Sequence, residues 1–307
     1  MKLAGLVVHG VQVTPSHRRI LFPAVVVSEP AGTYPRFMST TANDGTGSNA
    51  TMSLCDSYQQ VKERIAAAAE KSGRRADEIC LVTVTKNASM DQIRELMGLG
   101  QVDLGENRVQ QLTQRAGQVE EFLQRRMELS AGAQEADPLP EFVRWHMIGS
   151  LQRNKVRKAV ELSRLIHSVN SLRLAEEIQQ VSVKCDKPVE ILIEVNVTSE
   201  NSKQGIAPAA VRHLIDQIDT MVNIKPRGLM CMAPLMEGRP EQERLDGARH
   251  CFERCRELFE DIIRAGIGGN RFDILSMGMS ADFEPAIEEG ANMVRIGRSI
   301  VGESTES

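Results

Sequence analysis

The chain has 307 residues, of which 41% are hydrophobic and 25% charged, a composition ordinary for a globular protein with room for one large domain. The net charge of −4 and the pI of about 6.0 give no general support to a nucleic-acid-binding role. No apolar run approaches the ~20 residues that a membrane span needs. We therefore expect neither nucleic acid nor membrane as a partner, and the densest basic run, residues 151–160, is typical of a solvated helix face.

The cysteines form no short-spaced disulfide framework, which favours a reduced, intracellular protein. They are scattered through the chain at Cys55, Cys80, Cys185, Cys231, Cys251 and Cys255. Cys251 and Cys255 lie four residues apart beside His250, so a metal site has to be considered. Both, however, fall on the apolar stripe of a helical pattern, and this position favours buried thiols without a metal.

The first 55 residues differ from the rest in composition. They hold four basic side chains and two acidic ones, among many Ser, Thr, Gly and Pro residues. Such a leader suits an organelle transit peptide, which would direct the protein to the mitochondrion; a disordered extension, or a true start at Met38 or Met52, explains it equally well. We divide the chain into a leader at 1–55 and a domain at 56–303, and expect a cytoplasmic protein unless the leader is a targeting signal.

The domain opens with a helical pattern at 56–73, which we expect Asp56 or Ser57 to cap and Gly73 to end. Strand-like and helix-like segments then alternate. The eight strand candidates are 80–86, 102–106, 143–149, 165–170, 189–197, 224–232, 272–277 and 293–297. Between the second and third lies a helical pattern at 107–126, with Leu112, Ala116, Val119 and Leu123 on one face, followed by a polar loop at 130–141.

This alternation predicts parallel strands joined by crossovers, and eight such units in about 250 residues match a closed barrel. An open doubly wound sheet is the alternative, but it normally carries a glycine-rich turn after its first strand, and residues 84–89 have no glycine. The sequence therefore predicts an α/β protein with a single (β/α)8 TIM barrel preceded by an N-terminal helix.

Lys86 ends the first predicted strand. A lysine there commonly just reaches water. In a barrel, however, chemistry is placed at the carboxyl ends of the strands, and here the other seven ends are polar, small or glycine. A lysine at this mouth can hold a phosphate, act as a base or form a Schiff base with a carbonyl.

The last two strands favour a phosphate site. Gly278 and Gly297 let backbone N–H groups approach an anion, and Ser280 is expected to cap the following helix. A capped helix with turn glycines explains either loop alone, and Asp282 and Glu284 would repel a phosphate if they pointed inward. A Schiff-base lysine opposite a phosphate cradle suggests pyridoxal 5′-phosphate (PLP).

Six stretches, in order along residues 56–303, resemble the YggS/PROSC family of pyridoxal phosphate homeostasis proteins. They read "VTVTK", "LGENRVQQL", "RWHMIGSLQRNKVRKAV", "IEVNVTSENSKQGI", "RGLMCMAP" and "LSMGMSADFEPAIEEGANMVRIGRSIVG". The resemblance implies a barrel like the cofactor domain of alanine racemase, with PLP held as a Schiff base on Lys86. It also implies that Arg295 faces the pyridine nitrogen.

The other cofactor contacts implied by the resemblance lie around the whole mouth. Glu106 and Asn107 would line the ring; Ser280, Gly297 and the Arg298 N–H would hold the phosphate; and His146, Gly149, Asn196, Met230, Ser276 and Gly278 would complete the site. Arg298 departs from the family, which commonly has Thr at this position, so a charge contact replaces a hydroxyl.

Two functions of different classes remain open. The first, which we favour, is PLP binding and homeostasis without substrate turnover, by a monomer; the second is an amino-acid racemase or related PLP enzyme. Racemisation needs a base on each face of the substrate. The tyrosines, Tyr34 and Tyr58, lie outside the predicted mouth, no second domain is expected after the barrel, and a strand-end histidine such as His146 or His167 is more often structural. A barrel enzyme for phosphorylated sugars, with Lys86 as an aldolase-type lysine, is a weaker third alternative.

Overall fold

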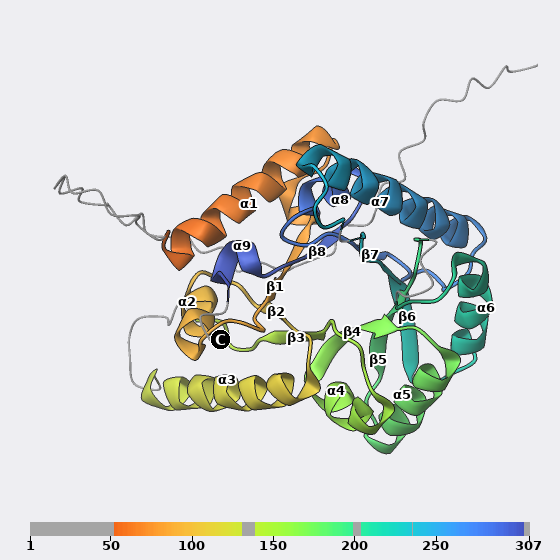
Figure 1. Ribbon diagram of the computed structural model, residues 1–307. Coiled ribbons are helices and arrows are strands. Elements are labelled where there is room, and N and C mark those ends of the chain that lie inside the picture. Colours follow the sequence, from red (N-terminus) through yellow and green to blue (C-terminus); the bar gives the residue numbers. More distant parts are fainter. Residues whose placement is uncertain (1–51, 131–138, 199–203, 235, 304–307) are drawn as a thin grey trace, which may run out of the picture. The chain divides into compact units, whose positions relative to one another are not determined.

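The computed structural model describes residues 52–130, 139–198, 204–234 and 236–303. Within these ranges eight parallel strands close into a barrel in chain order, with β1 pairing to both β2 and β8 (Figure 1). The strands are β1 Cys80–Val84, β2 Asp103–Glu106, β3 Arg144–Met147, β4 Ser163–Val169, β5 Val189–Glu194, β6 Ile224–Met230, β7 Ile274–Ser276 and β8 Met293–Ile296. The pairing of β1 with β8 excludes an open sheet and confirms the predicted (β/α)8 TIM barrel.

Helices surround the strands, as the alternating pattern requires (Figure 1). They are α1 Leu54–Lys71, α2 Met90–Gly98, α3 Val109–Ser130, α4 Val156–Leu162, α5 Leu172–Lys184, α6 Pro208–Asp219, α7 Glu241–Arg264, α8 Phe283–Glu288 and α9 Arg298–Val301, with short 3₁₀ turns at Ala76–Glu78 and Arg153–Lys155. The predicted apolar face of α3 is confirmed, because Leu112, Ala116, Val119 and Leu123 are all buried. Most of the predicted loop at 130–141, and the leader up to residue 51, lie outside the described residues.

Helix α1 begins earlier than the sequence suggested. Ser53 is its N-cap, and the Ser53 side chain accepts a hydrogen bond from the backbone N–H of Asp56 at 3.1 Å. The prediction that Asp56 or Ser57 caps the helix was therefore wrong: Asp56 lies in the first turn, where its negative charge suits the positive end of the helix dipole.

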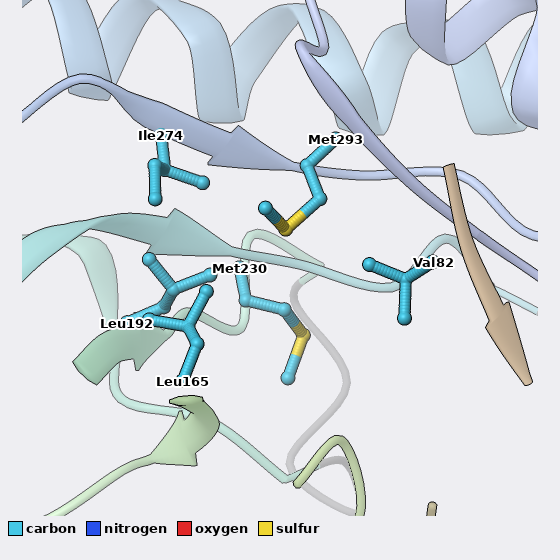
Figure 2. Close-up of a cluster of buried hydrophobic side chains, with 6 residues drawn as sticks. All are labelled: Val82, Leu165, Leu192, Met230, Ile274 and Met293. Carbon is cyan, nitrogen blue, oxygen red and sulfur yellow. The ribbon is translucent and has the colours of Figure 1, made fainter. Parts of the chain in front are cut away.

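The barrel interior is filled by side chains from six strands. These residues, all buried, are Val82, Leu165, Leu192, Met230, Ile274 and Met293 (Figure 2). Interior packing of this kind makes the barrel a core rather than a pore, so a ligand has to bind above it, at the loops. Met230, predicted to line the cofactor, belongs to this core.

The predictions about a metal site at Cys251 and Cys255 and about a membrane span can be compared with the described residues. Cys251 and Cys255 are buried on α7, as the apolar stripe predicted. In the described ranges, no group of three or more His, Cys, Asp or Glu residues could hold a metal ion. The helices described there also include none with the length and apolarity to span a bilayer.

Candidate functional site

A cavity of about 550 Å³ opens at the carboxyl ends of the strands. It brings together seven of the residues singled out from the sequence: Lys86, Asn107, Gly149, Ser280, Arg295, Gly297 and Arg298. They come from the loops after β1, β2, β3, β7 and β8 and from β8 itself, so residues more than 200 positions apart in the chain share one pocket. The lining also holds carboxylates that the sequence did not single out as ligands.

Lys86 lies in a turn just beyond β1, not at the end of the strand itself. The backbone N–H of Ala88 donates to the carbonyl of Thr85 at 2.8 Å, which places Lys86 and Asn87 at the tip of the turn. The Lys86 side chain is exposed, and its ammonium makes no ion pair or hydrogen bond to any residue that the structure describes. This lysine is therefore available to a ligand in the pocket.

Glu106, predicted to line a bound ring, lies instead beneath that turn. Its side chain is fully buried, and Oε1 accepts hydrogen bonds from the Thr85 hydroxyl at 2.5 Å and from Arg115. Since Glu106 is absent from the pocket lining, its role in the structure is to support the backbone that carries Lys86.

Arg295 forms the floor of the pocket. It is buried, and its guanidinium donates to the Ser276 hydroxyl at 2.6 Å and to the carbonyl of Cys231 at 3.0 Å. Burial lowers the pKa of Arg295, while Asp282 and Glu194 favour its charged form. An arginine with this pKa direction still remains charged at neutral pH, so the floor presents a fixed donor.

A chain of hydrogen bonds continues from this floor through the barrel interior. Nδ1 of His167 lies 3.2 Å from the Ser276 hydroxyl, and Nε2 of His167 lies 2.9 Å from Nδ1 of His146. Nε2 of His146 lies 3.1 Å from a carboxylate oxygen of Asp103, which also accepts two hydrogen bonds from Arg144 at 2.7 and 2.6 Å. His146 and Ser276 thus lie under the pocket and are not on the lining where the sequence put them.

The direction of this chain follows from its two ends. Arg295 can only donate, so Ser276 accepts from it and gives its own proton to His167. His167 then donates from Nε2 to His146, and His146 donates from Nε2 to Asp103, which can only accept. His167 carries a single ring proton in this arrangement, which agrees with its pKa: burial above all holds that pKa well below its usual range. Every donor and acceptor is satisfied in one direction, which fixes Ser276 and Arg295 in place.

Of two acidic residues in the pocket, Asp282 was considered from the sequence as a source of repulsion, and Glu194 was missed. Glu194 ends β5 and accepts a hydrogen bond from Asn170 at 3.3 Å; Asp282 accepts one from the backbone N–H of Met279 at 2.6 Å. Burial raises the pKa of both carboxyl groups. One signal for Glu194 was present in the sequence, a carboxylate within the otherwise apolar run 191–195, but the predicted strand continued to residue 197.

Extending that strand put Asn196 at the mouth. In the structure β5 ends at Glu194, two residues before Asn196. Oδ1 of Asn196 accepts hydrogen bonds from the N–H and the hydroxyl of Thr198 at 3.1 and 2.7 Å. Asn196 therefore shapes the loop after β5 and does not line the pocket.

The loop after β7 is held against the start of α9. Ser280 is not the cap of α8, as the sequence suggested, because the N-cap is Asp282; instead the Ser280 hydroxyl accepts from the backbone N–H of Ser299 at 3.3 Å. Gly278 has φ +89°, and a Cβ there would lie 2.7 Å from the Cβ of Ala286, so this close packing needs a glycine. Gly278 shapes the loop from behind the lining.

Glu284 does not repel an anion in this pocket. It points outward and forms an ion pair with Arg64 of α1 at 2.7 Å. Of the two acids whose repulsion was a concern, only Asp282 lines the pocket.

The unsatisfied groups of the pocket fit a small anionic aldehyde. Lys86 supplies a nucleophilic amine, Oδ1 of Asn107 is buried without a partner among the described residues, and Arg298 brings a positive charge to the lining. A Cβ on Gly149 would lie 2.1 Å from the carbonyl oxygen of Asn107, which shows how closely the loops after β2 and β3 approach.

Comparison with known proteins decides the family. The sequence model of the alanine racemase N-terminal domain matches residues 113–305. The pyridoxal phosphate homeostasis protein of Aquifex aeolicus is 36% identical over 82% of this chain and 99% of its own length, and that of Pseudomonas aeruginosa is 34% identical over 81% and 95%. The chain belongs to the YggS/PROSC family of pyridoxal phosphate homeostasis proteins.

Solved structures agree with this placement. PipY of Synechococcus elongatus, solved with PLP bound, is 30% identical to this family member, with a TM-score of 0.58 over 79% of this chain and all of PipY. A protein of unknown function from Bifidobacterium adolescentis is 34% identical, with a TM-score of 0.69 over 80% of this chain and 94% of its own. Alanine racemase of Clostridium difficile, at 14% identity and a TM-score of 0.56 over 82% of this chain and 58% of the racemase, shows the shared fold alone.

Proposed function

We propose that this protein binds PLP in the pocket at the mouth of the barrel, as a Schiff base with Lys86, and serves PLP homeostasis without turning over a substrate. The observation that carries the proposal is the Lys86 ammonium, which has no partner among the described residues and shares a pocket with the loops after β7 and β8. The relatives named for this role and the PLP-bound PipY support it.

The predicted contact residues that line the pocket have distinct roles in such a complex. Ser280, Gly297 and the backbone N–H of Arg298 would hold the phosphate, and the Arg298 side chain would add a positive charge beside them. Arg295 faces the pyridine nitrogen from the floor. PLP itself supplies an electrophilic aldehyde and a ring that accepts electrons.

Arg295 also explains why binding need not lead to turnover. A permanently charged donor beside the pyridine nitrogen discourages protonation of that nitrogen and keeps the ring a weak electron sink. The hydrogen-bond chain below holds Arg295 in that position. Tyr58, the tyrosine within the described residues, is buried on α1 with its hydroxyl 3.1 Å from Gln101, so it is not a base in the pocket.

The decisive experiment is an absorbance spectrum of the purified protein with PLP, followed by borohydride reduction and peptide mapping. We expect a Schiff-base band and a pyridoxyl mark on Lys86. Lys86→Ala should remain folded, since the side chain is exposed, and lack both band and mark. A mark on Lys155 or Lys203 would contradict the assignment.

Turnover is tested separately with the PLP-loaded protein. Incubation with L- and D-alanine and other amino acids should shift the chromophore without racemisation or keto-acid production. Turnover near ~1 s⁻¹, the low end of ordinary enzymes, would show that the protein is a PLP enzyme after all.

A further inference from the structure

We propose that Arg115 is a positioning residue for Lys86: its guanidinium holds the turn that presents the lysine to the pocket. The inference deepens the proposed PLP binding at Lys86 and rests on it. Arg115 is not part of the pocket lining, so any effect on the ligand has to pass through the backbone of the turn.

The turn itself has few hydrogen bonds of its own. Strand β1 ends at Val84, and the chain from Thr85 to Ala88 is closed by one backbone hydrogen bond of 2.8 Å. Beyond the strand end, backbone carbonyls lose their partners in the sheet and need others. The backbone N–H of Thr85 also donates to the carbonyl of Gly105 at 3.0 Å, which ties the first residue of the turn to the neighbouring strand.

A single side chain from the next β/α unit supplies the missing partners. Arg115, on α3, donates to the carbonyl of Ala88 at 2.8 Å and to that of Lys86 at 3.4 Å. It donates also to the carbonyl of Thr85. Gln111, one helical turn earlier, reaches the Lys86 carbonyl at 3.4 Å. One guanidinium therefore donates hydrogen bonds to three carbonyls of the four-residue turn.

A buried carboxylate keeps the guanidinium in place. Arg115 forms an ion pair with Glu106, and the exposed fractions of the two side chains are 14% and 0%. Glu106 also accepts a hydrogen bond from the Thr85 hydroxyl at 2.5 Å, so the same carboxylate binds both the turn and Arg115. Removing the arginine outright would leave this carboxylate uncompensated in the interior, at a large cost in stability.

Only the arginine side chain can do this. Its planar fork offers five donors in a fixed geometry, whereas lysine offers a compact point charge on a flexible stem. Arg115→Lys therefore keeps the charge beside Glu106 and loses the simultaneous contacts to the three carbonyls. This substitution therefore tests the hydrogen bonds to the turn separately from the ion pair with Glu106.

The test compares PLP binding in the full-length protein with three variants. Arg115→Lys should fold. Its apparent affinity for PLP, measured from the Schiff-base absorbance band, should be at least about tenfold weaker, as expected when a reacting group is displaced. Arg125→Lys, an exposed arginine on the same helix, is the matched control and should bind as the wild type does. Gln111→Ala, which removes one contact to the Lys86 carbonyl, should weaken the band less and in the same direction, and remains informative if Arg115→Lys does not fold.

A double-mutant cycle distinguishes positioning from general loosening of the pocket. Non-covalent PLP binding, measured by dialysis in a Lys86→Ala background, should not change further with Arg115→Lys or Gln111→Ala. An equal loss in that background, or an unchanged band in the single variants, would overturn the positioning role. If the wild type shows no Lys86-dependent band, the proposed function fails instead, and the two failures are thus distinct.

Discussion

Gly149 shows at the scale of one residue how the pocket is built. The loops after β2 and β3 come so close that a Cβ on Gly149 would overlap the carbonyl of Asn107 at 2.1 Å. Asn107 is also the residue with a buried, unpartnered Oδ1 at the lining. The spacing of these two backbones therefore sets where that oxygen points.

Gly149→Ala is expected to push the two loops apart. Overpacking of this kind costs roughly 1–3 kcal/mol, and the displaced Asn107 should weaken PLP binding as well. Gly117→Ala is the matched control, because a Cβ there meets nothing within 4 Å. In the interior of α3 it should raise the free energy of unfolding by about 0.5–1 kcal/mol and leave PLP binding unchanged. Urea unfolding and PLP titration of both variants check this; equal effects would contradict it.

The sequence identified some site residues and could not identify others. Lys86 and Gly297 were predictable because they lie at the ends of predicted apolar strands, whereas the role of Arg295 was implied by the family resemblance. Glu194 was missed because the end of a strand depends on which residues pair in the ladder, and β-branched residues continue past that point. Arg115 carries no signal in the sequence, since its hydrogen bonds to the turn reach residues 27 to 30 positions back along the chain.

At the scale of elements, the hydrogen-bond chain connects five strands across the barrel. Its members lie on β2, β3, β4, β7 and β8, so no local pattern reveals it. The strands themselves were predictable, because parallel strands buried on both faces give continuous apolar runs. The helix caps at Ser53 and Asp282 were not, because several serines and aspartates near each start satisfy the same preference.

Asp103 makes this chain sensitive to acid. Burial by itself would raise the pKa of Asp103, but hydrogen bonds from Arg144 and His146 outweigh it and lower the pKa to about 2. The pKa in the unfolded chain is about 3.9, so Asp103 stabilises the fold above pH ~4 by about 2.5 kcal/mol. This contribution is lost as the pH falls toward the folded-state pKa, and about half of it is gone by pH ~3.

Asp103→Asn is therefore expected to be less stable at pH 7 and to lose less stability between pH 5 and pH 3. The difference in acid dependence should be on the order of 1 kcal/mol. Urea unfolding at both pH values measures it. Asp77, exposed and paired with Arg75, provides the control: Asp77→Asn should leave the wild-type acid dependence nearly intact. Parallel curves for Asp103→Asn and the wild type would contradict the assignment.

At the scale of the whole molecule, the alternation of segments predicted parallel strands, and the lack of a glycine-rich turn after the first strand favoured the barrel over an open sheet. Eight strands with helices between them have one closed arrangement that buries every strand on both faces. The leader at 1–55 stays a prediction, because residues 1–51 lie outside the described residues. Where a fusion of residues 1–55 to a reporter accumulates would distinguish a mitochondrial transit peptide from an extension without a targeting role.

A chain beginning at Met52 is expected to fold and bind PLP as the full chain does. Every strand of the barrel, the capping Ser53 and the pocket lie within residues 52–303, and the Aquifex relative aligns over 99% of its own length with only 82% of this chain. Residues 52–303 therefore hold every described strand, the cap of α1 and the pocket lining. The midpoint of thermal unfolding should shift by less than about 2 °C, which corresponds to less than ~1 kcal/mol in a domain of this size.

A chain beginning at Gln59 is the control, because it lacks the first turn of α1 and its cap and should melt at a lower temperature. A large loss of stability or of PLP binding on starting at Met52 would show that the leader packs on the barrel.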